Sequence, residues 1–138
     1  MAPVIILAGG KSQRMGKNKA FLEYRGRPFI SLIVREMLKV SEELVVVIGS
    51  KSRSKFESML TDRSVKFVND EHQFANPLGG MLSGFNQISQ DYAPIIPCDS
   101  PLINCRVVEF LFGEARHHSA AVSIWDEEDR MHQCYDQL

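Results

Sequence analysis

The stretch VIILAGGKSQRMGKNKAF (Val4–Phe21) joins an apolar run to a turn of small residues and then to a group of cations. Val4–Leu7 has the composition of a buried strand, and it leads directly into Ala8-Gly9-Gly10. Glycines present backbone without side chains to whatever lies beside them. Four basic residues then fall within nine positions: Lys11, Arg14, Lys17 and Lys19. Exposed backbone N–H groups backed by cations suit a polyphosphate.

Around this stretch, short apolar runs alternate with segments that have helical spacing. The runs predicted as strands are Pro3–Leu7, Leu44–Ile48, Val65–Val68, Ala93–Pro97 and Ala120–Trp125. The segments predicted as helices are 28–40, 52–61, 78–90 and 104–117, with Asn104 as the N-cap of the last. The runs lack polar alternation, which is typical of strands covered on both faces. The repeated order of strand, helix and strand predicts an α/β fold: a three-layer α/β/α sandwich with a mostly parallel sheet and right-handed crossovers.

The end of the chain departs from this order. AVSIW, DEEDR and MHQCYDQ, residues 121–137, predict a terminal hairpin, because polar and apolar residues alternate in the last segment. We expect residues 1–138 to form one domain, since this length can bury roughly two-thirds of the unfolded surface. A sheet that ends on an unfinished strand has an open edge, which favours a homo-oligomer or a chain of marginal stability.

Composition excludes several classes of function. The net charge of −1 gives no overall field for nucleic acid or an anionic membrane, although residues 11–27 hold six of the sixteen Lys and Arg. No apolar run approaches the roughly 20 residues of a membrane span, and the N-terminus does not resemble a signal peptide. Cys98, Cys105 and Cys134 lack metal-ligand spacing, and reduced thiols in a cytoplasmic protein are the expected state.

Two familiar phosphate-binding loops do not match the first loop. A P-loop needs a glycine five residues before its Gly-Lys pair, where this chain has Ile5. A dinucleotide fingerprint needs spaced glycines and an acid near the end of the second strand, which here ends in Ile48-Gly49. A plain tight turn with solvated lysines remains an alternative, and Lys11 and Lys17 in particular can be bystanders.

Two further motifs follow later strands of the predicted sheet. IIPCDSPLI (Ile95–Ile103) places Asp99 at the same sheet edge as the glycine loop, where it can bind Mg²⁺ shared with phosphates or serve as a turn residue. NDEHQFANPLGGMLSG (Asn69–Gly84) places Asp70 after the third strand and Pro77–Gly80 at a helix start. Paired glycines there allow close approach of a base or ribose, but a long loop with a tight helix entry is the alternative.

Together these residues resemble the molybdenum cofactor guanylyltransferases, within the nucleotidyltransferases of the Rossmann-like, nucleotide-diphospho-sugar transferase type. The resemblance covers essentially the whole chain. Its motifs, in order, are Leu7-Ala8-Gly9-Gly10, Arg14-Met15-Gly16, Lys19, Asp70, Pro77-Leu78-Gly79-Gly80 and Pro97-Cys98-Asp99-Ser100-Pro101. Sugar-phosphate nucleotidyltransferases typically follow the equivalent lysine with proline, whereas Lys19 is followed by Ala20.

The resemblance implies Mg²⁺-dependent transfer of GMP from GTP to molybdopterin or its molybdenum-loaded form, with release of pyrophosphate. It implies a nucleotide-binding set of Leu7, Ala8, Gly9, Gly10, Arg14, Lys19, Asp70, Gly80 and Asp99. Within this set Arg14, Lys19 and Asp99 are the implied catalytic residues, and Asp99 is the implied metal ligand. The nucleophile is a phosphate oxygen of the acceptor, so the protein needs positioning and charge stabilisation rather than a covalent residue.

The chain departs from this family in three places. Asn18 stands where an acid commonly precedes the lysine, and Ile48-Gly49-Ser50 lacks an asparagine that is often found after the second strand. Family members also continue well past the equivalent of Leu138, so we expect much of the acceptor side to be missing. Three alternatives therefore stay open: a sister enzyme with a cobinamide or sugar phosphate as acceptor, a nucleotide-binding protein without turnover, and a structural α/β domain. Guanine as the base rests on the resemblance alone.

Overall fold

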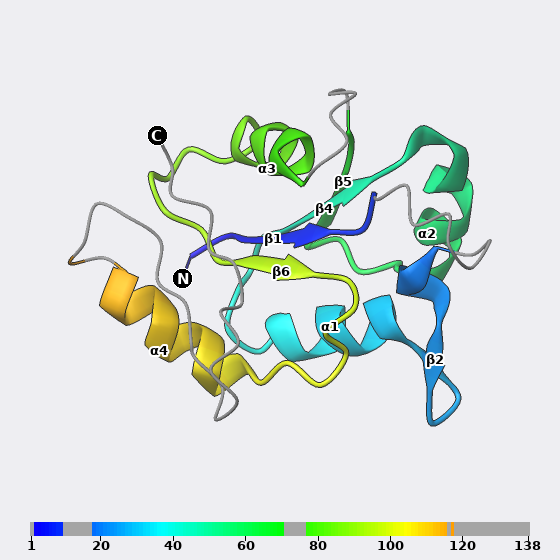
Figure 1. Ribbon diagram of the computed structural model, residues 1–138, viewed down its shortest axis with the longest axis horizontal. Coiled ribbons are helices and arrows are strands. Elements are labelled where there is room, and N and C mark those ends of the chain that lie inside the picture. Colours follow the sequence, from blue (N-terminus) through cyan, green and yellow to red (C-terminus); the bar gives the residue numbers. More distant parts are fainter. Residues whose placement is uncertain (1, 10–17, 71–76, 116, 118–138) are drawn as a thin grey trace.

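The fold is a parallel sheet between helices, in a computed structural model that describes residues 2–9, 18–70, 77–115 and 117. In this part of the chain the sheet has four strands: β1 (Val4–Leu7), β4 (Leu44–Ile48), β5 (Val65–Asn69) and β6 (Ile95–Pro97). Strand β1 lies between β4 and β6, and β5 flanks β4 (Figure 1). All three pairings are parallel, and Ile5 of β1 lies opposite Val45 on one side and Ile95 on the other.

The order β5-β4-β1-β6 creates a point where the chain changes direction across the sheet. From β1 the chain proceeds outward through β4 to β5, and it then returns to the other side of β1 to form β6. In open α/β sheets, ligands bind beyond the carboxyl ends of the strands that flank such a switch point. The carboxyl ends of β1 and β6 are therefore the expected location of a ligand site.

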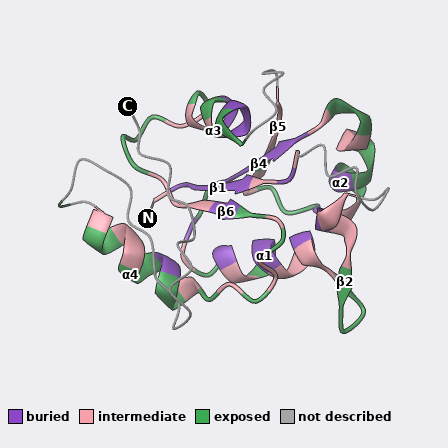
Figure 2. Cartoon of the chain, in the orientation of Figure 1, coloured by how far each residue is buried: buried purple, intermediate pink, exposed green. Residues whose placement is uncertain are grey.

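Helices cover both faces of the sheet, as Figure 1 shows. On one face lie α1 (Phe29–Met37), α2 (Arg53–Met59) and α4 (Cys105–Ala115), which bury Ile33, Phe56 and Val108 against alternate strand residues such as Ile6. On the other face lies α3 (Leu78–Phe85), whose Phe85 packs near Ile5. The central strands β1 and β4 are almost continuously buried, whereas β5 and β6 are mostly of intermediate burial (Figure 2). Hydrophobic burial on both faces therefore specifies the centre of the sheet.

A small hairpin and two short 3₁₀ helices lie outside the predicted elements except at Pro28 and Ser52, the first residues of two predicted helices. Strands β2 (Glu23–Tyr24) and β3 (Arg27–Pro28) pair antiparallel through Arg25 and Gly26, which have positive φ angles of 52° and 78°. Each strand has only two residues, which is too short for a periodic pattern. The 3₁₀ helices are η2 (Lys19–Phe21) and η3 (Ser50–Ser52).

The sequence predictions for the sandwich are confirmed within the described residues. The four predicted strands there match observed strands within two residues at each end, and the predicted helices contain α1 to α4. Asn104 does cap α4, because its Oδ1 accepts a hydrogen bond from the Arg106 N–H at 2.8 Å. The predicted strand Ala120–Trp125 and the terminal hairpin lie outside the described residues. Among the helices of the described part, none is long and apolar enough to cross a membrane.

Candidate functional site

The candidate site is built on the carboxyl end of β1, where the backbone stays paired on both sides after the strand ends. The Ala8 N–H donates to the Val47 carbonyl oxygen at 2.8 Å, and the Cys98 N–H donates to the Leu7 carbonyl oxygen at 3.1 Å. The segment after β6 therefore continues alongside β1. This pairing fixes the backbone of residue 99 beside the start of the glycine loop.

Gly9 lies close to the backbone at the end of β4. A Cβ atom on Gly9 would lie 2.9 Å from the Ile48 carbonyl carbon and 3.0 Å from the Gly49 nitrogen. Both atoms belong to main chain, which cannot move aside as the end of a side chain can. Glycine is therefore required at this position by contact with the end of β4, before any ligand is considered.

Lys19 and Asp99 meet across this edge of the sheet. The Lys19 Nζ lies 3.8 Å from the Asp99 Oδ2, and the two side chains are 45% and 51% exposed. An ion pair as exposed as this contributes about 0–1 kcal/mol to stability. Breaking this ion pair so that each side chain binds a ligand group would therefore cost little stability.

Asn18 links this lysine to β1. Its Nδ2 donates to the Ala8 carbonyl oxygen at 3.0 Å, and its Oδ1 accepts from the Ala20 N–H at 3.0 Å. Asn18 is not among the site residues predicted from sequence, because its bond to Ala8 joins residues ten positions apart. The only sequence signal was its place directly before Lys19.

Asp70 and Gly80 lie together on the α3 face of the same edge. The Asp70 N–H donates to the Ile48 carbonyl oxygen at 2.9 Å, which extends the pairing of β5 with β4. A Cβ on Gly80 would lie 3.3 Å from the Leu7 Cδ2 and 3.7 Å from the Asp70 Oδ2. The structure thus brings Leu7, Asp70 and Gly80 into one group at the first turn of α3.

Seven of the nine predicted nucleotide-binding residues are described, and all seven lie at or beside the carboxyl edge. They are Leu7, Ala8, Gly9, Lys19, Asp70, Gly80 and Asp99. Gly10 and Arg14 lie outside the described residues, as do Lys11 and Lys17.

Cys98, which precedes Asp99, is partly buried against the core. This burial raises the pKa of its thiol to about 11, and the neighbouring Asp99 charge acts in the same direction. The thiol is therefore protonated at neutral pH, whereas the thiolate is the reactive form. Cys98 and Cys105 are both free thiols.

The described residues fit a metal that is shared with a ligand rather than a closed protein cage. Among them there is no group of three or more His, Cys, Asp or Glu side chains suited to a metal ion. Mg²⁺ is commonly held by one or two carboxylates, with substrate phosphates and water completing six oxygen ligands. Asp99, half-exposed beside Lys19, suits this mode.

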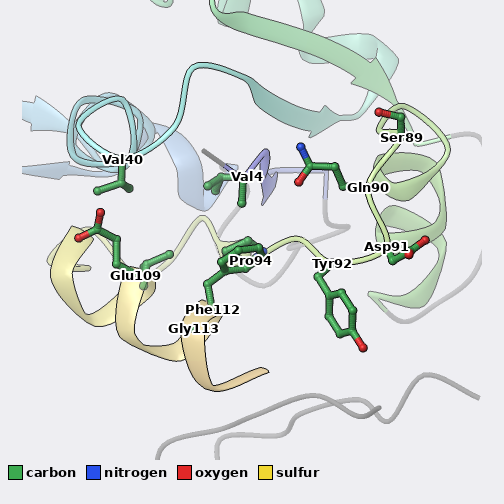
Figure 3. A pocket seen from close by; sticks show the side chains of 12 residues that line it. Val4, Val40, Ser89, Gln90, Asp91, Tyr92, Pro94, Glu109, Phe112 and Gly113 are labelled. Atoms are coloured by element: carbon green, nitrogen blue, oxygen red, sulfur yellow. The ribbon is translucent and has the colours of Figure 1, made fainter. Parts of the chain in front are cut away.

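A cavity lies at the opposite edge of the sheet. It has a volume of about 720 Å³, and Figure 3 shows Val4, Pro94 and Phe112 among its lining residues. Val4 begins β1 and Pro94 precedes β6, so this cavity opens at the amino ends of the strands. It is lined by none of the predicted site residues.

Comparison with known proteins matches almost the whole chain to one family. The model of the MobA-like NTP transferase domain matches residues 4–135. A probable molybdenum cofactor guanylyltransferase of Methanosarcina acetivorans is 32% identical over 134 residues, which cover 94% of this chain and 59% of the relative. One of the same name from Methanothermobacter thermautotrophicus is 39% identical over 101 residues, 72% of this chain and 51% of the relative. The chain thus spans little more than half the length of these relatives.

Solved structures show the same fold at low sequence identity. A nucleotidyl transferase from Methanothermobacter thermautotrophicus superimposes with a TM-score of 0.70 at 19% identity, over 82% of this chain and 57% of the other. The molybdopterin-guanine dinucleotide biosynthesis protein A of Archaeoglobus fulgidus gives a TM-score of 0.66 at 20% identity, over 90% and 62%. These likenesses establish the Rossmann-like architecture.

Proposed function

Because the chain belongs to the family of MobA-like NTP transferase domains, we propose that it transfers GMP from GTP to molybdopterin or its molybdenum-loaded form. The guanine base and the acceptor are taken from the names of relatives such as the Methanosarcina acetivorans protein. We also propose that residues 1–138 form one domain and that the protein acts in the cytoplasm.

The observation that carries the proposal is the pairing of Lys19 with Asp99 beside the bare backbone of Gly9. One side chain is a cation suited to phosphate oxygens and the other is a carboxylate suited to a divalent cation. They lie 3.8 Å apart at the edge where ligands bind in this class of sheet. A nucleoside triphosphate with its metal would use both charges and would replace a weak ion pair by stronger ones.

The reaction needs positioning and charge, and each residue has a proposed part. An acceptor phosphate oxygen attacks the α-phosphorus, a new P–O bond forms, the bond to the bridging α–β oxygen breaks, and pyrophosphate leaves with the electron pair. Lys19 stabilises the charge that spreads over the α-phosphate oxygens, and Arg14 neutralises the β- and γ-phosphates. Leu7 to Gly10 are proposed to run their backbone along the nucleotide. The free N–H groups would come from Gly9 and Gly10, because the Ala8 N–H is donated to the Val47 carbonyl oxygen.

The nucleoside is proposed to lie between the glycine loop and α3. Leu7, Gly80 and Asp70 form one group there, and a Cβ on Gly80 would lie 3.3 Å from the Leu7 Cδ2. The Asp70 carboxylate is an acceptor for hydroxyl or N–H donors of the nucleoside.

Asp99 would hold Mg²⁺ together with phosphate oxygens. The ion supplies neutralising charge when it is bound with the nucleotide. Lys19 sits on the same edge, so the two positive charges would flank the phosphates.

The proposal is tested by pyrophosphate release from each of the four nucleoside triphosphates with molybdopterin as acceptor, and with a sugar phosphate in parallel. We expect release with GTP, Mg²⁺ and molybdopterin together. Lys19→Ala should lower the rate by about 100-fold, the usual effect of removing one transition-state donor. Lys66→Ala, which removes an exposed lysine from β5, is the control for Lys19→Ala. Asp91→Asn, at the opposite edge of the sheet, is the control for Asp99→Asn.

Release that needs another base or acceptor would reassign the chain to a sister nucleotidyltransferase. Binding of Mg-GTP without release across the acceptors would make it a binding protein without turnover. If neither Lys19→Ala nor Asp99→Asn differs from its control, the proposed site is wrong.

A further inference from the structure

Lys19 is carried by a single 3₁₀ turn, and its position depends on how that turn is held. The far side of η2 is anchored against α2. Ala20 is fully buried, and the Phe21 ring centroid lies 4.6 Å from that of Phe56. The Lys55 Nζ lies 4.1 Å from the Phe21 centroid, which adds a cation–π contact from the same helix.

On the near side of η2, the described residues include one side chain that is hydrogen-bonded to the turn and to the end of β1, that of Asn18. Its amide donates to the Ala8 carbonyl oxygen and accepts from the Ala20 N–H, each at 3.0 Å. A planar amide that is used at both ends fixes the separation of those two backbone groups. Because Ala8 is the first residue after β1 and Ala20 is the neighbour of Lys19, this fixes the lysine relative to the sheet edge.

Asparagine is the side chain that this bridge requires. An ionised aspartate could accept from the Ala20 N–H, but it has no proton to donate to the Ala8 carbonyl. It would instead place a carboxylate against a carbonyl oxygen. Alanine loses both bonds and leaves the carbonyl of the buried Ala8 without this partner.

We propose that Asn18 is a positioning residue, whose amide bridge from Ala8 to Ala20 directs Lys19 toward Asp99 and the triphosphate. This inference rests on the proposed function for its consequence in nucleotide binding. The bridge also pairs the Ala8 carbonyl, a partial negative charge at the strand end where phosphates are proposed to bind. Positioning Lys19 and pairing the Ala8 carbonyl would both favour binding of the triphosphate. Only the positioning acts through Lys19.

A double-mutant cycle separates positioning from a general structural role. The affinity for Mg-GTP is measured by calorimetry for the full chain, Asn18→Ala, Lys19→Ala and the double variant. We expect Asn18→Ala to weaken binding about tenfold in the parent and less than twofold in the Lys19→Ala background. Equal weakening in both backgrounds would overturn the proposal, because Asn18 would then act independently of Lys19.

Asn18→Asp is the second variant, and it keeps the acceptor for the Ala20 N–H. Asn104→Asp is its matched control, since Asn104 also caps a helix start through its Oδ1. Thermal unfolding is followed for every variant. If Asn18→Ala does not fold, Asn18→Asp replaces it in the double-mutant cycle. If neither Asn18 variant unfolds cooperatively, Asn18 acts on folding and the proposal is wrong.

A readout without nucleotide distinguishes this inference from the proposed function. The ¹³C-dimethyl-lysine NMR signal of Lys19, assigned with Lys19→Arg, should shift in the same direction for Asn18→Ala as for Asp99→Asn. Asn104→Asp should leave it in place. A parent chain that binds no nucleoside triphosphate contradicts the proposed function, and the NMR signal then decides the inference by itself. An unmoved signal in Asn18→Ala would overturn it.

Discussion

Gly9 lies against the backbone at the end of β4, and its substitution gives a clear prediction. Gly9→Ala forces a Cβ to within 2.9 Å of the Ile48 carbonyl carbon. Overpacking against main chain costs about 1–3 kcal/mol, and the loop must shift away from β4. We expect a lower thermal midpoint together with weaker Mg-GTP binding, measured by calorimetry.

Gly49 supplies the control for Gly9. It lies in the adjacent backbone with a φ of −77°, and a Cβ there meets nothing within 4 Å. Gly49→Ala should leave the thermal midpoint within a degree or so of the parent or slightly above it. A Gly9→Ala chain as stable as Gly49→Ala would contradict the close contact.

Glu36 links two helices and makes a prediction about pH. Its Oε1 accepts from the Cys105 N–H at 3.1 Å, at the start of α4, and its other oxygen accepts from Lys39. The Lys39 hydrogen bond and then the Cys105 N–H lower the pKa of Glu36 from 4.5 to about 2. The carboxylate therefore stabilises the fold fully above about pH 4.5 and loses this effect as the pH falls toward 2.

Urea unfolding of Glu36→Gln measures this effect. We expect a loss of about 1 kcal/mol at pH 7, the usual value of a helix-capping contact, and a shrinking difference from the parent below pH 4.5. Glu57→Gln is the control, because Glu57 makes an exposed pair with Arg53 on one helix. A difference that grows on acidification would have the wrong sign for this assignment.

At the scale of elements, the close packing of α3 on β1 depends on Gly84. A Cβ there would lie 2.7 Å from the Ile5 Cγ2, inside the fully buried core. We expect Gly84→Ala to lower the free energy of unfolding by about 1–3 kcal/mol. Gly113→Ala in α4 is the control, since nothing lies within 4 Å of its Cβ and alanine favours the helix by about 1 kcal/mol. Equal effects of the two changes would contradict this packing.

The elements that sequence predicted are those that bury continuous apolar runs. LVVVI of β4 is fully buried, and such a run has few alternatives to a central strand. The β2–β3 hairpin was missed because its residues are largely exposed and its turn uses Arg25 with Gly26. Arg25 in a left-handed conformation carries no sequence signal of the kind that Asn-Gly provides.

At the scale of the molecule, self-association remains a prediction. In the described part of the chain, β5 pairs only with β4 and β6 pairs only with β1, which leaves one edge of each unpaired. Open edges favour pairing with another chain. Analytical ultracentrifugation should show dimers or larger species, and a stable monomer with a high thermal midpoint would contradict the expectation.

The sequence by itself determined the parallel sheet and the glycines that follow its first strand. Apolar runs of buried strands and adjacent glycines are local features, which can be recognised in a few consecutive residues. Only the tertiary structure brought Lys19 to within 3.8 Å of Asp99 and joined Asn18 to Ala8. These contacts link segments that are distant in sequence or separated by a loop. Their geometry depends on strand order and on the packing of η2 against α2, which local patterns of residues do not encode.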